Sequence, residues 1–407
     1  MEHEKMEMNP AIGGANLSPR RVKLVMAAIT FCMFVMGFSM FKLLPMQAPI
    51  MNYFNIEVSS YGYLNTASSW VTVIFTIPVA FLIRKISSKW CMLLWFVLLL
   101  GGSLIQVVTA NYVLFVIGRM IEGAGAGFLA LLGHSLTANL VPRNRIGFWA
   151  SFMVTVGMLG QVILTNVSTW LMEGLGYDFQ FVFTLLIILE AACLVVWLLL
   201  VPASIRVTGT ANSAKPTREQ TMRVFKNPSN WLVSVALIFF NISIVSFSAY
   251  VIVYMGQRGI PAAEAGPLYS YTSLIGIFAM LAFGWLADKF GTKRKLAVFS
   301  FFTGIIALLL LVHVPIHMIW IYIVVFGTLP RSVAGMSQAC APDIAEMPMD
   351  IPVVNSFRNT VSQLGNIAGG IITGYLLQYI GYTNTIYVLC VLMALGGVCW
   401  IFAKKVP

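Results

Sequence analysis

The chain has 407 residues, of which 59% are hydrophobic and 10% are charged, and its formal net charge is +11. This composition excludes an ordinary soluble domain, which is about half apolar and about a quarter charged. The apolar residues gather in blocks of about 20 or more, the length that crosses a bilayer as a helix. Because lipid offers no hydrogen bonds to backbone groups, such blocks must be helical. We therefore predict an all-α, polytopic membrane protein.

Twelve membrane-spanning helices are predicted in chain order. The first six cover residues 22–44, 61–83, 90–109, 112–132, 147–172 and 179–201. The second six cover 231–254, 266–288, 296–314, 318–342, 352–379 and 383–402. They predict two pseudo-symmetric six-helix bundles, at 22–201 and 231–402. Residues 202–230 are polar and are predicted to be a cytoplasmic linker with a short surface helix over 217–225. The tails at 1–21 and 403–407 are also predicted to be cytoplasmic.

Lysine and arginine determine the predicted orientation. With the N-terminus inside, the basic clusters at 20–23, 84–89, 143–145 and 293–295 all become cytoplasmic, and the outer loops keep little beyond Arg258. This is the positive-inside asymmetry of a protein in a bacterial-type inner membrane with both termini in the cytoplasm. It accounts for the positive net charge without a nucleic-acid partner.

The two halves of the chain repeat each other in sequence. Ser151-Phe152 recurs as Ser356-Phe357, 205 residues later, and the same separation relates Leu159-Gly160 to Leu364-Gly365 and Gly176-Tyr177 to Gly381-Tyr382. The fourth predicted span carries Arg119-MIE-Gly123, and the tenth carries Arg331-SVA-Gly335 at a separation of 212. Helical repeats of this size are typical of secondary transporters, whose substrate site is expected near the midplane where the repeats meet.

The loop after the eighth span reads GWLADKFGTKR over residues 284–294 and resembles the loop motif of the major facilitator superfamily. Arg119-Met-Ile-Glu122-Gly123 resembles the fourth-helix motif of the same family, with Glu in place of the usual Gln. The resemblance implies the twelve-helix fold and transport by alternating access. It also implies a gating role for four residues of the loop: Gly284, Asp288, Gly291 and Arg294. The alternative interpretation is a basic loop that only sets topology.

Residues 358–365, RNTVSQLG, resemble the eleventh-helix segment of the oxalate/formate antiporters, in which a lysine stands at the position of Arg358. Those carriers also have an eighth-helix arginine, where this chain has Met280. The Gly-Pro motif that marks the fifth helix of drug/proton antiporters is missing. The resemblance therefore favours an anion carrier over a drug or cation exporter.

A charged side chain at the bilayer centre costs about 2.5–3.5 kcal/mol on insertion scales, so each one suggests a function. Arg358 lies on a polar stripe of the eleventh span, and a guanidinium can grip a carboxylate with two parallel bonds. We predict a substrate site at Arg358, Asn359, Gln363, Asn355 and Arg331. The alternative is that Arg358 snorkels to the cytoplasmic interface.

The acidic residues within the spans are candidates for proton coupling. Arg119 and Glu122, three residues apart on one helix, either neutralise each other or couple transport to protonation. Glu190 has no charged neighbour in sequence, so it either pairs with a cation such as Arg119 or is protonated. Lys42, near the outer end of the first span, is expected to snorkel.

The sequence thus predicts a secondary transporter of a small organic anion, with a carboxylate as the expected substrate, coupled to protons or to anion exchange. Its predicted partners are a small anionic solute, the lipid bilayer and, under proton coupling, a proton. The superfamily resemblance implies a monomer. We also predict that the protein is not an enzyme and binds no cofactor or metal, since the sequence has no Walker motif, catalytic constellation or metal-spaced cluster. A drug or cation exporter of the same fold and a non-transporting sensor or scaffold are the alternatives.

Overall fold

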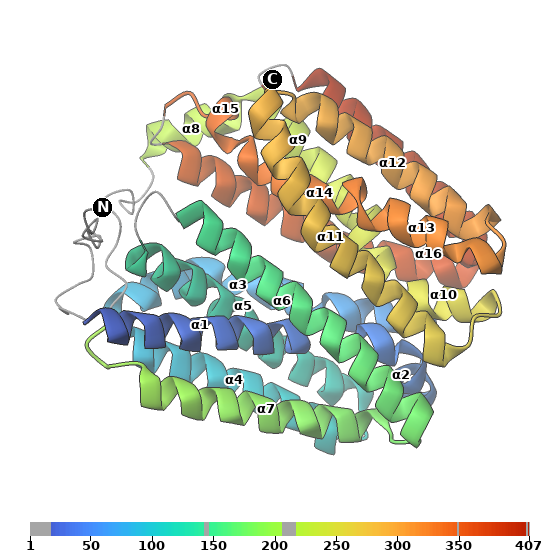
Figure 1. Ribbon diagram of the computed structural model, residues 1–407, viewed down its shortest axis with the longest axis horizontal. Coiled ribbons are helices and arrows are strands. Elements are labelled where there is room, and N and C mark those ends of the chain that lie inside the picture. The colour runs from blue at the N-terminus through green and yellow to red at the C-terminus, as the bar shows by residue number, and fades with distance from the viewer. Residues whose placement is uncertain (1–17, 142–145, 206–216, 348–349, 404–405, 407) are drawn as a thin grey trace, which may run out of the picture. The chain divides into compact units, whose positions relative to one another are not determined.

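The computed structural model describes residues 18–141, 146–205, 217–347, 350–403 and 406, and within these residues it contains helices and no strand (Figure 1). The helices of the first half are α1 (Pro19–Phe41), η1 (Leu44–Met46), α2 (Gln47–Phe54), α3 (Val58–Lys85), α4 (Ser88–Val108), α5 (Tyr112–Leu140), α6 (Ile146–Thr169), η3 (Trp170–Gly174) and α7 (Phe179–Leu200). Those that follow are α8 (Arg218–Lys226), α9 (Pro228–Phe240), η4 (Asn241–Ser246), α10 (Val251–Gln257), α11 (Ala262–Phe290), α12 (Lys293–His313), η5 (Ile316–Met318), α13 (Ile319–Gly327), α14 (Leu329–Ala339), α15 (Ala341–Ile344) and α16 (Ile351–Phe402).

Nine segments of the described residues are long and apolar enough to cross a membrane. One of them, Val353–Phe402, covers two predicted spans, and two further predicted spans correspond to α3 and α11. The prediction of an all-α, polytopic membrane protein is confirmed. The surface helix expected at 217–225 is also present, as α8, and it begins with a capping box at Thr217.

Several spans are less regular than the sequence suggested. The seventh span consists of α9, the π-helical segment η4 and α10, and the tenth is divided at Thr328 into α13 and α14. Between the eleventh and twelfth spans the chain turns at Gly381, whose φ of 75° is in the left-handed region. Gly176, its counterpart in the sequence repeat, has a φ of 73°. Glycine adopts this conformation without the steric cost that a Cβ would bring, so the same turn chemistry is used twice.

The chain divides into two compact units. Unit 1 comprises Met1–Lys42, Ala67–Leu164 and Tyr177–Ala214, and unit 2 comprises Leu43–Thr66, Thr165–Gly176 and Lys215–Pro407. Unit 2 therefore includes two segments from the first half of the sequence. The division into six-helix bundles at 22–201 and 231–402 stays a prediction.

Unit 1 is built around α1, which contacts α5 and α7, while α4 packs on α5 and α7. Its core contains large side chains that are fully buried, among them Trp95, Phe96 and Trp197. On the contact between α1 and α6, a Cβ built on Gly37 would lie 2.2 Å from the carbonyl oxygen of Gly157. Glycine therefore allows these two helices to approach closely, as is common between membrane helices.

Unit 2 repeats this arrangement with α16 packed on α9, η4 and α12. A Cβ on Gly365 of α16 would lie 2.8 Å from the Cα of Ile238 in α9, just as one on Gly160 would lie 2.6 Å from the carbonyl oxygen of Phe34 in α1. Gly160 and Gly365 are counterparts in the repeat. The repeated glycine thus has the same packing role in each unit.

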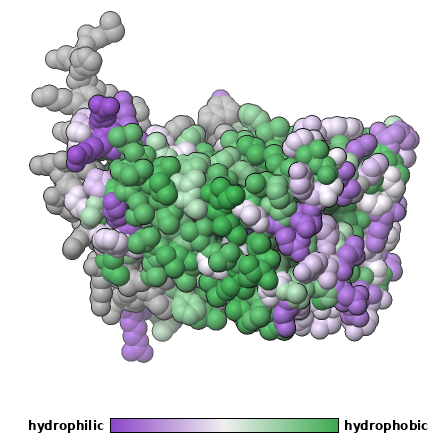
Figure 2. Space-filling model, turned by 90° about the horizontal axis from the view of Figure 1, so that it is seen from below, coloured by the Kyte–Doolittle hydropathy of each residue, from purple (hydrophilic) through white to green (hydrophobic). Residues whose placement is uncertain are grey.

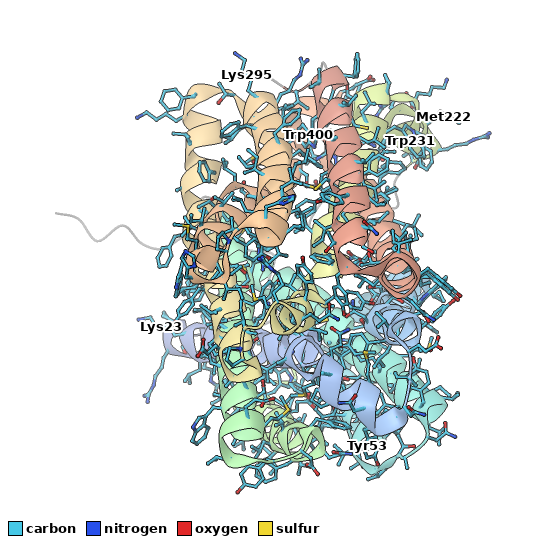
Figure 3. The ribbon with its side chains drawn as sticks, turned by 90° about the vertical axis from the view of Figure 1, so that its right-hand side faces the viewer. Lys23, Tyr53, Met222, Trp231, Lys295 and Trp400 are labelled. Carbon is cyan, nitrogen blue, oxygen red and sulfur yellow. The ribbon has the colours of Figure 1, made fainter. Side chains whose placement is uncertain are left out.

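Exposed hydrophobic side chains are numerous, as expected for a surface in contact with lipid. In unit 1, α4 and α7 expose large apolar residues such as Val97, Ile188 and Leu199, and hydrophobic residues predominate over much of the face shown in Figure 2. In unit 2, the corner where α8 meets α9 carries Met222 and Trp231, both more than 40% exposed (Figure 3). The indole nitrogen of Trp231 donates to the carbonyl oxygen of Phe225, which fixes this corner.

Candidate functional site

Unit 1 buries a cluster of charged side chains around Glu122. The Oε2 atom of Glu122 lies 2.9 Å from Nζ of Lys42 and 3.2 Å from Nη1 of Arg119, and it accepts a hydrogen bond of 2.6 Å from Nε2 of Gln106. None of these four side chains is more than 3% exposed. The predicted pairing of Arg119 with Glu122 is therefore present, and Lys42 and Gln106 join it.

The prediction for Lys42 was wrong. Its side chain is fully buried, and its ammonium group lies 4.2 Å from the centre of the Phe183 ring as well as beside Glu122. Lys42 directly follows the last residue of α1, so the end of this helix points the lysine into unit 1. Its partner, Glu122, is 80 residues away in sequence (42 to 122), and local patterning gave no indication of it.

The end of α1 also explains how Arg119 is held. Nη1 and Nη2 of Arg119 donate to the carbonyl oxygens of Ser39 and Met40, at 2.8 and 3.0 Å. The last carbonyls of a helix have no partner within the helix and carry its partial negative charge, so a guanidinium stabilises them. Arg119 is thus bound by a carboxylate and a helix end together.

Glu190 of α7 lies in the same buried region but has different partners. Its Oε1 atom accepts hydrogen bonds from Oγ of Ser39 at 2.5 Å and from Oγ of Ser103 at 3.4 Å. Among the described residues no lysine or arginine lies within ion-pair distance of it, so the predicted pairing with Arg119 is not observed. Ser39 contacts both groups: its hydroxyl bonds Glu190, and its carbonyl oxygen accepts from Arg119.

In unit 2, Arg331 of α14 is surrounded by hydroxyl groups and aromatic rings. Its Nη2 atom donates to the hydroxyl of Tyr269 at 3.0 Å and to Oγ1 of Thr272 at 3.1 Å, both on α11. The guanidinium carbon also lies 5.4 Å from the ring centre of Phe326, within the range of a cation–π interaction. The contacts that hold Arg331 are therefore with neutral groups.

Arg358 of α16 is buried and points toward α9 and α14. Nε donates to Oδ1 of Asn230 at 3.3 Å, and Nη1 donates to the carbonyl oxygen of Ser337. Only 1% of the residue is exposed, so in this structure Arg358 does not snorkel to solvent. Its two partners are again neutral.

The other residues of the predicted substrate site have separate environments along α16. Asn366 donates to Gln363, while Asn355 is half-buried and Asn359 is exposed. Ser362, which shares their stripe, accepts from Nδ2 of Asn241 at 2.8 Å. The polar stripe is therefore partly occupied by contacts within unit 2.

The predicted gating residues lie at the junction of α11 and α12. Gly291 has a φ of 57°, which explains the need for glycine there, and Arg294 donates to the carbonyl oxygen of Ile401. Gly284 and Asp288 lie in α11, but their side-chain positions are outside the described part of the chain. Lys293, the first residue of α12, pairs with Asp343 of α15 at 3.1 Å.

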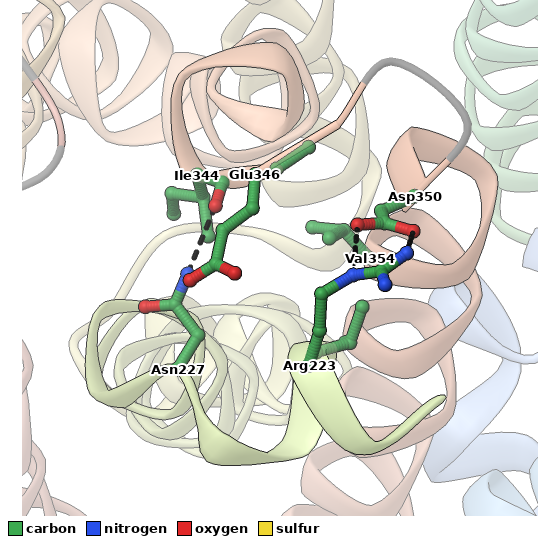
Figure 4. Close-up of a pocket in the computed structure, with 8 residues that line it drawn as sticks. Arg223, Asn227, Ile344, Glu346, Asp350 and Val354 are labelled. Atoms are coloured by element: carbon green, nitrogen blue, oxygen red, sulfur yellow. Dashed lines mark hydrogen bonds and ion pairs between the residues drawn. The ribbon is translucent and has the colours of Figure 1, made fainter. Parts of the chain in front are cut away.

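A small pocket between α8 and the start of α16 contains an ion pair that the sequence did not indicate (Figure 4). Arg223 binds Asp350 with two parallel bonds, Nε to Oδ2 and Nη2 to Oδ1, each 3.0 Å long. The hydrogen bonds to Asp350 raise the pKa of the Arg223 guanidinium above its usual value. Beside this pair, Nδ2 of Asn227 donates to the carbonyl oxygen of Ile344. The linker is thus attached to the helix that carries Arg358.

Comparison with known proteins identifies the family. The model of the Major Facilitator Superfamily matches residues 29–348, which is more than half of the chain. The chain belongs to this superfamily. It is therefore a multi-pass membrane transporter with a small-molecule substrate, as the loop and fourth-helix motifs suggested.

Curated relatives within the superfamily are distant. A probable sugar efflux transporter of Mannheimia succiniciproducens is 20% identical over 92% of each chain. A putative transporter of Escherichia coli, AraJ, is 20% identical over 58% of this chain and 57% of its own. An agnestins efflux protein of Paecilomyces divaricatus is 22% identical over 74% of this chain and 70% of its own.

Solved structures show the same fold at lower identity. A bacterial homologue of the human lysosomal transporter Spinster, in an inward-facing and unoccupied conformation, has a TM-score of 0.73 and is 14% identical, with 96% of this chain and 98% of that one covered. The nucleoside transporter NupG, in a mutant form, has a TM-score of 0.79 and is 12% identical, with coverage of 94% and 99%.

Proposed function

We propose that this superfamily member moves a small organic anion, with a carboxylate as the favoured substrate, by alternating access. The observation that carries the proposal is a difference in charge balance. Arg119 in unit 1 is paired with Glu122, whereas Arg331 and Arg358 in unit 2 are held by hydroxyl, amide and carbonyl groups. Buried cations require compensation, and an anionic substrate supplies it.

Both arginines of unit 2 retain an unused donor, as Arg119 does at its Nε atom. Nη2 of Arg358 and Nε of Arg331 are buried and have no hydrogen-bond partner among the described residues. Leaving a charged donor unsatisfied costs more than leaving a neutral one, so a ligand oxygen that accepts from it gains free energy. Carboxylates fit this role because their two oxygens match the planar guanidinium. Asn355, Asn359 and Gln363 offer amides that orient the rest of the solute.

We further propose that proton coupling uses the buried cluster of unit 1, with Glu190 as the carboxylate that gains and loses the proton. Glu122 is held by two cations and an amide, which compensate its charge in this structure. Glu190 contacts only hydroxyl groups at hydrogen-bond distance, so both charge states are accessible to it. A change in the protonation of Glu190 would alter its hydrogen bond with Ser39. Because the carbonyl oxygen of Ser39 accepts from Arg119, this change would also affect the contacts at the end of α1.

A second candidate is the efflux of a sugar or another neutral polar solute. It is favoured by the relative named as a probable sugar efflux transporter, which aligns with 92% of this chain. The amide groups of Asn355, Gln363 and Asn366 on α16 can donate to and accept from hydroxyl groups. Under this alternative, Arg331 and Arg358 are structural residues.

Three features of organisation belong to the same proposal. The protein has two six-helix bundles, lies in the inner membrane with both termini in the cytoplasm, and acts as a monomer. The basic clusters at 84–89 and 293–295 support the orientation through the positive-inside rule. Gly284, Asp288, Gly291 and Arg294 are proposed to gate the cytoplasmic side.

Transport by purified protein in proteoliposomes tests the proposal. Radiolabelled mono- and dicarboxylates, sugars and lipophilic cations would be compared with and without an imposed pH gradient. We expect carboxylate transport that Arg331→Gln and Arg358→Gln each abolish. The matched control is Arg258→Gln, which removes an arginine that also binds backbone carbonyl oxygens, those of Leu311 and Val314, away from the site. Transport of sugars or cations alone, unaffected by Arg358→Gln, would contradict the anion proposal.

A further inference from the structure

A second pocket, of about 180 Å³, lies in unit 2, and its lining includes none of the residues assigned above to substrate, coupling or gating. It is formed by η1 and the start of α2, by the end of α6 with the π-helical segment η3, and by α10. Its walls are mostly apolar and include Pro49, Met172 and Ile252. A site of this size is smaller than the roughly 300–1,000 Å³ that enclose drug-sized ligands, so it suits a small organic molecule.

Gln47 places a buried polar group against this pocket. The residue is 1% exposed, and its Oε1 atom has no hydrogen-bond partner among the described residues. Its Nε2 atom contacts Sδ of Met51 at 3.6 Å, which is only a weak acceptor. A buried amide oxygen without a partner costs free energy, and a donor in the pocket would remove this cost.

Glu173 contributes a negative charge to the same pocket. It lies in η3, a π-helical segment of five residues that directly follows α6. Such segments are rare and frequently occur at functional sites, because the extra residue changes the direction of side chains. Thr169, also in the lining, already donates its hydroxyl hydrogen to the carbonyl oxygen of Thr165, so toward a ligand its oxygen acts as an acceptor. The residues that line the pocket include no lysine, arginine or histidine.

We propose that this pocket binds a small organic cation, namely a primary amine with a compact apolar body. The ammonium group would bind the exposed carboxylate of Glu173, and a turn of the Gln47 side chain would bring its buried amide oxygen to the same group, while the apolar body would contact Met172 and Ile252. An ammonium group has three donors and no acceptor, which matches a lining that offers acceptors. The proposal does not depend on the anion site at Arg331 and Arg358, because none of those residues lines this pocket.

The structure offers a way to fill the pocket without disturbing the surrounding helices. Gly256 of α10 lines it, and a Cβ built there meets no heavy atom within 4 Å. A leucine at this position would extend into open space, and leucine favours a helix more than glycine does. Gly101 of α4 is a matched control, because a Cβ there also meets nothing within 4 Å and it lies in unit 1.

Thermal unfolding of the purified protein with benzylamine and cyclohexylamine tests the proposal, with benzyl alcohol as the uncharged control. A ligand that binds only the folded state stabilises it by RT ln(1 + [L]/Kd) and so raises the melting temperature. We expect the amines, and not the alcohol, to raise the melting temperature of the wild type. Loss of a charge-assisted bond in Glu173→Gln should weaken amine binding about ten- to hundredfold. Gly256→Leu should abolish binding, whereas Gly101→Leu and the exposed control Glu264→Gln should retain it.

Two results would overturn the proposal. Amines that leave the melting temperature unchanged would mean that the pocket holds water only. Amines that stabilise Glu173→Gln and Gly256→Leu as well as the wild type would bind elsewhere. A carboxylate response in the same variants would report on the anion site separately, so the two proposals can fail independently.

Discussion

Arg119 of unit 1 and Arg331 of unit 2 are counterparts in the sequence repeat, but their electrostatic surroundings differ. In unit 1, Arg119 is followed three residues later by Glu122, which neutralises it, and its Nη1 and Nη2 atoms also donate to two carbonyl oxygens at the end of α1. In unit 2, Arg331 occupies the matching place in the repeated motif, but Ala334 stands where the glutamate would be. Its partners are hydroxyl groups and aromatic rings. The difference teaches that the arginine of unit 1 has a carboxylate partner, whereas its counterpart in unit 2 is bonded to neutral groups.

A second pair of matched positions also differs in charge between the two units. Met153 of α6 and Arg358 of α16 are 205 residues apart (153 to 358), and both are buried, at 0% and 1% exposure. Oγ1 of Thr30 in α1 contacts the sulfur of Met153 at 3.9 Å, whereas Asn230 in α9 accepts from Arg358. The burial is retained while an apolar group is replaced by a cation. This asymmetry is what a substrate-binding role would require.

The largest expected effect comes from removing the counter-charge of unit 1. In Glu122→Gln, the buried cations Lys42 and Arg119 lose their carboxylate. Breaking a buried ion pair on one side costs about 3–5 kcal/mol, because an uncompensated charge stays buried. We expect a lower melting temperature and poor yield in detergent, measured by thermal unfolding. Glu264→Gln, at an exposed position, should behave as the wild type.

A double variant sharpens this prediction. Lys42→Met combined with Glu122→Gln removes one cation along with the carboxylate, so it should recover part of the stability that Glu122→Gln loses. With Lys42→Met measured alone, losses of stability that simply add in the double variant would show that Lys42 and Glu122 do not interact, contrary to their separation of 2.9 Å.

Replacing Arg358 of unit 2 by the residue at the matching position of unit 1 should weaken anion binding. Arg358→Met places at position 358 the residue that its counterpart, Met153, already has. A hydrogen bond to a charged group contributes about 1.5–3 kcal/mol, so binding of the carboxylate should weaken about ten- to hundredfold. Ligand titration followed by thermal unfolding measures this. Unchanged affinity would assign Arg358 to structure alone.

Substitution of the repeated glycines should lower the stability by a similar amount in both units. Gly160→Ala and Gly365→Ala each add a methyl group that would lie less than 3 Å from backbone atoms of α1 or α9. Overpacking of this kind costs about 1–3 kcal/mol. Gly101→Ala meets no neighbour and should leave stability unchanged or slightly raised. A tolerant Gly365 beside a sensitive Gly160 would show that the units do not share this packing.

The smallest expected effect on stability, and a selective one on function, comes from Glu190→Gln. Glutamine can still accept from Ser39 and Ser103, so unfolding should change by only about 1 kcal/mol. Since glutamine cannot take up a proton, the pH dependence of transport should disappear while substrate binding persists. Transport rates in proteoliposomes between pH 5 and 8 check this, and a pH profile like that of the wild type would exclude Glu190 as the coupling group.

Much of the fold could be predicted from local pattern, because apolar blocks of membrane length and a constant repeat separation need no knowledge of contacts. The pair formed by Arg119 and Glu122 was predictable for the same reason, since three residues along a helix lie on one face. The burial of Lys42 was not, because it depends on where α1 ends and on a carboxylate far away in sequence. The bonds from Arg358 to Asn230 and from Arg223 to Asp350 likewise join residues more than 120 positions apart.

The most direct test of the central claim is thermal stabilisation of the wild type, Arg331→Gln and Arg358→Gln by a panel of carboxylates, sugars and lipophilic cations. The account predicts that carboxylates stabilise the wild type and that both variants lose this response while they remain folded. If sugars or cations are the ligands, and both variants respond to them as the wild type does, then the arginines of unit 2 are structural and the anion proposal is contradicted.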